Sequence, residues 1–122
     1  MSRRGHRAAE RGTVTAEAAM VLPALLVVLA LCLSGLSLAV DQVRCVDAAR
    51  VAARAASRGE EPAQVREAAL RLAPPESTVR LEHAGSDVVV HVTAPGPRLL
   101  PGLEGARARA VTPVEPGVRQ GW

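Results

Sequence analysis

The chain has 122 residues, a formal net charge of +3 and a single aromatic residue, Trp122. That length allows one small domain, and the absence of Phe and Tyr leaves few large side chains for an aqueous core. Residues 1–12 hold four of the fifteen basic residues and one of the twelve acidic ones, so the remaining residues carry eleven of each. Because a nucleic-acid surface needs its basic excess on the folded part, we expect no nucleic-acid partner.

The first two predicted elements are a basic leader, residues 1–12, and a transmembrane helix, residues 13–40. Residues 18–40 contain no charged side chain. As a helix they would extend about 34 Å, enough to cross a hydrocarbon core of about 30 Å. Basic residues beside a hydrophobic span are retained in the cytoplasm. The sequence therefore predicts a single-pass protein of the cell membrane, with a cytoplasmic N-terminus and an extracytoplasmic C-terminal part.

Beyond Val40 the helical pattern continues, and we predict an extracytoplasmic extension of the same helix over residues 41–58. Apolar residues recur along one of its faces at spacings of three and four: Val43, Val46, Ala49, Ala53 and Ala56. Its other faces are lined with alanine, which favours a helix and lets a neighbouring backbone approach closely. Gly59 is placed to end this helix in the left-handed conformation.

A small α+β body is predicted over residues 59–112. Pro62 suits the first turn of a short second helix that ends near Leu72, before two prolines. Its predicted apolar face comprises Val65, Ala68, Ala69 and Leu72. Alternation of residues between two faces then predicts strands over residues 79–82 and 88–93, joined as an antiparallel hairpin. Residues 106–112 could add a third, edge strand, and residues 113–122 are predicted to form a flexible tail.

The residues that usually support catalysis or metal binding are sparse. His83 and His91 lie on the predicted hairpin, where they could face each other, but no Cys, Asp or Glu stands at metal-ligand spacing. No nucleophile and base pattern, phosphate loop or carboxylate pair stands out. We therefore expect no enzyme activity, no metal and no cofactor. Cys32 and Cys45 lie too far apart on one helix for a disulfide, so they are packing residues or, for Cys45, an intermolecular contact.

The informative cluster lies where the leader meets the helix. Glu17 is the only charged residue between Arg11 and Asp41. It could simply mark the headgroup level at the membrane boundary. Alternatively, cleavage after Gly12 would create an amino group on Thr13, four residues before the carboxylate. That amine is largely cationic at neutral pH, and it could pair with Glu17 of the same or a neighbouring helix.

This region resembles the class III signal of type IV prepilins. The resemblance lies in the basic leader that ends at Gly12, in Glu17 as the fifth residue of the mature chain, and in the hydrophobic helix that follows. More specifically, the stretches RGTVTAEAAMVLPALLVVLALCLSGLSLAV, DAARVAARAASRG and ARARAVTPVEPG resemble TadE-like proteins of the tight-adherence (Flp) pilus system. The arginine-rich, lysine-free composition resembles actinobacterial versions. The resemblance covers most of the chain and is diffuse in its C-terminal part.

The resemblance implies a minor pilin or pseudopilin that takes part in assembling a type IV (Flp/Tad) pilus or a related secretion apparatus, with prepilin cleavage between Gly12 and Thr13. It makes Glu17 the assembly and processing carboxylate. Its implied partners are a prepilin peptidase, other pilin subunits packed through the helix, an assembly ATPase and platform proteins. Thr13 departs from the apolar first residue of major pilins, which leaves N-methylation open. Pro23 would kink the helix, either to aid fibre packing or as a proline that membrane bundles tolerate.

Two other interpretations stay open. In one, a secretory signal peptide is cut near Ala39, at the small-x-small pattern Ser37, Leu38, Ala39, and releases a small protein that begins at Val40. In the other, the chain is an uncleaved bitopic membrane protein that acts through its external body.

Overall fold

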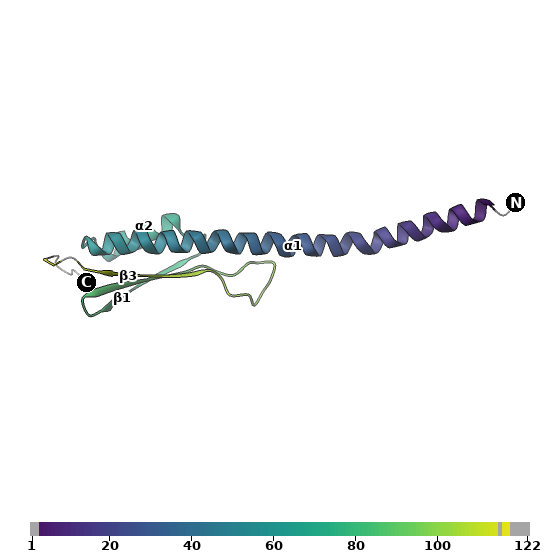
Figure 1. Ribbon diagram of the computed structural model, residues 1–122. Helices are drawn as coiled ribbons and strands as arrows, with labels where there is room; N and C mark the ends of the chain where they lie inside the picture. The colour runs from purple at the N-terminus through teal and green to yellow at the C-terminus, as the bar shows by residue number, and fades with distance from the viewer. Residues whose placement is uncertain (1–2, 115, 118–122) are drawn as a thin grey trace. The chain divides into compact units, whose positions relative to one another are not determined.

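The computed structural model describes residues 3–114 and 116–117, with side chains from Arg7 onward (Figure 1). Its elements in chain order are α1 (Arg3–Ser57), α2 (Pro62–Leu72), β1 (Thr78–Ala84), β2 (Asp87–Thr93) and β3 (Arg107–Pro113). This order confirms the predicted α+β fold. The chain divides into two compact units, residues 1–35, here called the N-terminal unit, and residues 36–122, here called the body.

The N-terminal unit is a helix whose apolar side chains are exposed. Met20, Leu22 and Leu26 keep 81%, 60% and 65% of their surface accessible. The core helix of a soluble protein would bury such residues. The helix continues through Pro23, and it is long and apolar enough to cross a membrane. A single-pass membrane protein is therefore consistent with the structure.

In the body, glycine and proline set the ends of the helices, as the sequence predicted. Gly59 has a φ of 74°, its N–H donates to the Ala56 carbonyl at 3.0 Å, and Glu60 N–H donates to the Ala55 carbonyl at 3.2 Å. This pair of bonds is a Schellman motif, which satisfies carbonyls that a helix end would leave free. Helix α2 begins at Pro62, and its cap residue Ala73 is extended because a proline follows it.

The sheet is antiparallel with the strand order β1-β2-β3, which confirms the third strand. Strands β1 and β2 each extend beyond the predicted bounds, which leaves only Gly85 and Ser86 between them. The resulting register pairs Arg80 with His91 and His83 with Val88. The predicted facing of His83 and His91 is therefore wrong. Since side chains alternate along a strand, these two histidines point to opposite faces of the sheet.

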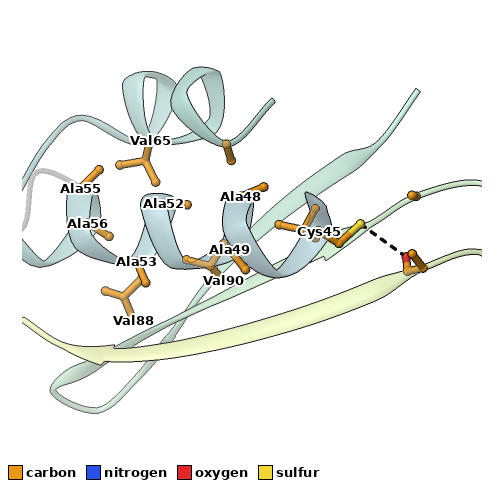
Figure 2. Close-up of a cluster of buried hydrophobic side chains, with 14 residues drawn as sticks. Cys45, Ala48, Ala49, Ala52, Ala53, Ala55, Ala56, Val65, Val88 and Val90 are labelled. Atoms are coloured by element: carbon orange, nitrogen blue, oxygen red, sulfur yellow. Dashed lines mark hydrogen bonds between the residues drawn. The ribbon is translucent and has the colours of Figure 1, made fainter. Parts of the chain in front are cut away.

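The core lies between the later part of α1, helix α2 and one face of the sheet (Figure 2). Alanines on α1 allow α2 and the sheet to approach closely, and β2 contributes valines from alternate positions. The buried cluster comprises Cys45, Ala48, Ala49, Ala52, Ala53, Ala55, Ala56, Val65, Ala69, Val88, Val90, Val92, Ala94 and Ala106. Val65 and Ala69 confirm the predicted inner face of α2, whereas Leu72 remains 42% exposed.

The apolar face of the α1 extension is only partly buried. Val43 keeps 61% of its surface exposed, whereas Cys45, Ala48 and Ala52 are fully buried. Close packing by the alanines of this helix agrees with the sequence, which lines its other faces with alanine. The small residues are the buried ones because the backbones of α1 and its neighbours approach closely, which leaves no room for larger side chains between them.

The segment between β2 and β3 is a loop that returns the chain to the sheet. Ala94 N–H donates to the Ala106 carbonyl at 2.8 Å, and a side chain at Gly105 would clash with the backbone of Ala94. Strand β3 ends at Pro113, one residue beyond its predicted end. The predicted flexible tail lies partly outside the described residues, at 115 and 118–122.

Candidate functional site

The predicted processing and assembly residues all lie on α1 in the N-terminal unit. Gly12, Thr13 and Glu17 are exposed, and a Cβ built at Gly12 would meet no atom within 4 Å. The threonine hydroxyls turn back onto the helix: Thr13 Oγ1 donates to the Ala9 carbonyl at 2.9 Å, and Thr15 Oγ1 donates to the Arg11 carbonyl at 2.8 Å. The Gly12–Thr13 bond is thus surface-accessible but helical, so a peptidase would have to unwind this turn to cleave it.

Helical geometry brings Thr13 and Glu17 onto one face, because residues four apart are neighbours on a helix surface. In the uncut chain the nitrogen of Thr13 is an amide and carries no charge. Cleavage after Gly12 would make it an amine, and the carboxylate of Glu17 would then lie near the new, positive end of the helix. The arrangement can therefore form an ion pair only after processing.

Pro23 lies further along the same helix. It has no N–H, so the carbonyl of Ala19 has no regular helical donor. The surrounding side chains are exposed apolar residues, which would face lipid or neighbouring helices in a membrane.

In the body, Cys45 is the buried titratable group. Its thiol is fully buried and lies 3.8 Å from the Ala106 carbonyl, which accepts a hydrogen bond from it (Figure 2). Burial raises the pKa of this thiol, and the nearby Asp41 carboxylate raises it further. This confirms Cys45 as a packing residue and excludes it as an intermolecular contact in this fold. The described residues contain no group of three or more His, Cys, Asp or Glu side chains that could hold a metal ion.

A basic surface that was not predicted from the sequence lies on the outer face of the sheet, the face away from the core. The register places Arg80, His91 and Arg109 in one row across the three strands. His91 Nε2 lies 3.4 Å from a carboxylate oxygen of Glu82. An open hollow of about 320 Å³ lies beside this row, lined by Thr78, Arg80, Glu82, His91, Thr93 and Arg107. The alternation of polar residues along each strand predicts a polar face, but the position of the three side chains in one row depends on the pairing register of the strands.

The chain was compared with known protein families, known proteins and solved structures. The TadE-like protein family matches residues 12–54, a stretch that begins at Gly12 and ends within the core-forming part of α1. A Mycobacterium tuberculosis protein named "Apoptosis inhibitor Rv3655c" is 45% identical over 101 residues, which cover 83% of this chain and 78% of that protein. No solved structure matches the chain. The family match and the extent of this similarity together show that the chain belongs to the TadE-like protein family.

Proposed function

We propose that this protein is a minor pilin or pseudopilin that takes part in assembling a tight-adherence (Flp, type IV) pilus or a related secretion apparatus. Membership of the TadE-like family supports involvement in such a system. The observation that carries the proposal is that the family match starts at Gly12, where the basic leader ends and the exposed apolar helix begins. Its role is structural rather than enzymatic.

In this proposal a prepilin peptidase cuts between Gly12 and Thr13 and removes the leader with its charge excess. The N-terminus lies in the cytoplasm before the cut, because the leader is basic, and the body lies outside. The helix then packs against the helices of other pilin subunits, with platform proteins and an assembly ATPase acting on the membrane-bound form. Glu17 is the carboxylate that meets the Thr13 amine of its own or a neighbouring subunit.

The first experiment determines the N-terminal residue of the protein recovered from membranes. Thr13 supports prepilin processing, Val40 supports a secretory signal peptide, and Met1 or Ser2 supports an uncut anchor. Gly12→Ala is expected to block the cut. Since a Cβ at Gly12 meets no neighbour and alanine favours helices, such a block would reflect peptidase recognition and not misfolding.

Gly35→Ala is the matched control, because Gly35 also lies in α1 and has equal space around it. It should leave the mature mass unchanged. If Gly12→Ala or loss of the peptidase also leaves the mature mass unchanged, the chain is not a prepilin.

A second experiment separates cleavage from assembly. Glu17→Ala should still be cut but should fail to enter a fibre, because the buried amine of a neighbour would lose its anionic partner. Glu17→Gln keeps the shape and removes the charge, so it should fail as well. Glu10→Ala, in the removed leader, is the control and should assemble normally. Normal incorporation of Glu17→Ala would contradict the pairing role.

The name of the Mycobacterium tuberculosis relative supports a second candidate function, inhibition of apoptosis. Such an activity on another cell would require release of the body. A cut near Ala39 would leave every fully buried core residue in the released part, since these lie at or beyond Cys45, and would remove only Leu38 from the side chains packed against the core. Recovery of a form that begins at Val40 outside the cells, and that lowers apoptosis when added to cultured cells, would favour this candidate over the pilin.

A further inference from the structure

Strand β3 has a free edge. Hydrogen bonds join Ala94 N–H to the Ala106 carbonyl at one end of the β2–β3 pair and Val114 N–H to the Ser86 carbonyl at the other. Backbone groups alternate in direction along an antiparallel strand. In the observed register, Ala108, Ala110 and Thr112 therefore bond to β2, and the backbone groups of the residues between them point away from the sheet.

One end of that edge is already satisfied within the body. The side chain of Gln42 donates from Nε2 to the Arg107 carbonyl at 2.8 Å and accepts from Arg107 N–H at 3.2 Å. This side chain occupies the place that a neighbouring strand would take. Among the described residues, no partner bonds to the outward backbone groups of Arg109 and Val111. Val111 also keeps 52% of its surface exposed.

The side chains along this edge differ between the two faces. On the inner face, Ala108 and Ala110 border the core. On the outer face, the register places Arg109 beside His91 and Arg80. Arg80 and Arg109 form no ion pair with any described residue, whereas Arg107 contacts Glu104 at 2.9 Å. The outer side of the edge is therefore basic and incompletely neutralised.

We propose that the β3 edge binds an extended segment of a partner protein as a fourth strand, in which acidic residues alternate with small apolar ones. Its backbone would pair with Arg109 and Val111. Its acidic side chains would lie on the outer face beside Arg109, and its apolar side chains would extend the inner face beside Ala108 and Ala110. A second copy of β3 fits less well, because it brings its own arginines to the same face. This surface belongs to the body alone and does not depend on a pilus function.

The test uses the full chain in lipid nanodiscs and a short synthetic peptide in which glutamate alternates with valine. Binding is measured by fluorescence anisotropy, and protection of individual amides by hydrogen exchange. The peptide should bind and should slow exchange at Arg109 and Val111. Two control peptides should bind at least about fivefold more weakly. A lysine–valine peptide loses the charge match with Arg109. A glutamate–valine peptide methylated on every backbone nitrogen cannot donate backbone hydrogen bonds to β3.

Two variants separate charge from backbone pairing. Arg109→Glu should weaken binding of the glutamate peptide about fivefold and strengthen binding of the lysine peptide. Arg66→Glu, at an exposed position of α2 with no ion pair to a described residue, is the control and should change neither. Val111→Pro removes an outward N–H that β2 does not use, so it should abolish binding while the β2–β3 ladder stays protected.

Several results would overturn the proposal. They are absence of peptide binding, equal binding of the three peptides, protection at residues other than the β3 edge, and an Arg109→Glu effect no larger than that of Arg66→Glu. Concentration-dependent protection of Arg109 and Val111 without any peptide would assign the edge to a second copy of the chain instead.

Discussion

The Cys45 thiol is held neutral by its surroundings, because burial and the neighbouring Asp41 carboxylate both raise its pKa. The unfolded chain therefore loses this proton first. Stability from the neutral thiol is complete below the unfolded pKa of about 8.5 and is lost as pH rises toward the folded pKa. We expect the free energy of unfolding of the body to fall above about pH 8.5. In Cys45→Ala, this contribution to the pH dependence of the free energy of unfolding should be absent. Denaturant titrations at several pH values measure it.

The same residue predicts a difference in reactivity. Thiolates, not thiols, react with iodoacetamide, so Cys45 should be alkylated slowly in the folded body and rapidly once the body is unfolded. Mass spectrometry of digested protein separates Cys45 from Cys32. Equal alkylation rates for Cys45 in folded and unfolded protein would contradict its burial.

Ala52 tests the close approach of α1 to its neighbours. It is fully buried and belongs to the same core cluster as Val65 of α2 (Figure 2). Ala52→Leu should destabilise the body by about 1 to 3 kcal/mol, because the added carbons have no space without moving a helix. Val51→Leu, one residue earlier on the exposed side, should change stability by less than about 0.5 kcal/mol. Denaturant unfolding measures both, and similar effects would show that the alanines do not set the packing distance.

At the level of elements, the sequence predicted most of the fold because each element carries a local signal. Gly59 and Pro62 mark helix ends, and alternation in residues 78–93 marks two strands. The signals that failed were those that need a neighbour. Val43 shares the apolar face of the α1 extension but stays exposed, and the predicted facing of His83 and His91 is wrong because the two-residue loop sets a different register. Periodicity fixes which residues share a face, but not which face is covered.

The contact between Gln42 of α1 and Arg107 of β3 joins residues far apart in the sequence, so no local pattern predicts it. Gln42→Ala should destabilise the body by about 1 kcal/mol and speed exchange of the Arg107 amide, because both bonds to the strand are lost. Gln42→Glu keeps an acceptor for Arg107 N–H but cannot donate, so it should retain more of the amide protection. Gln64→Ala, at an exposed position of α2, is the control. Unchanged exchange at Arg107 in Gln42→Ala would mean that this contact contributes nothing.

For the whole molecule, the candidate processing site was predictable and the sheet surface was not. Gly12, Thr13 and Glu17 lie within six residues of one another, so their spacing is a property of the sequence alone. The row of Arg80, His91 and Arg109 joins three strands and exists only after pairing. The near-neutral charge of residues 13–122 concealed it, because net charge does not describe where charges gather on a surface.

The two compact units suggest that membrane insertion and folding of the body are separable. Leu29→Arg places a charge in the apolar span, at a cost of about 2.5 to 3.5 kcal/mol for insertion, so a larger fraction should be extracted by alkaline carbonate. The body of that variant should keep its protease resistance. Val90→Ala should do the opposite: loss of buried carbons destabilises the body by about 2 kcal/mol while membrane retention stays normal. Release of Val90→Ala from membranes, or a protease-sensitive body in Leu29→Arg, would show instead that each unit needs the other to be stable.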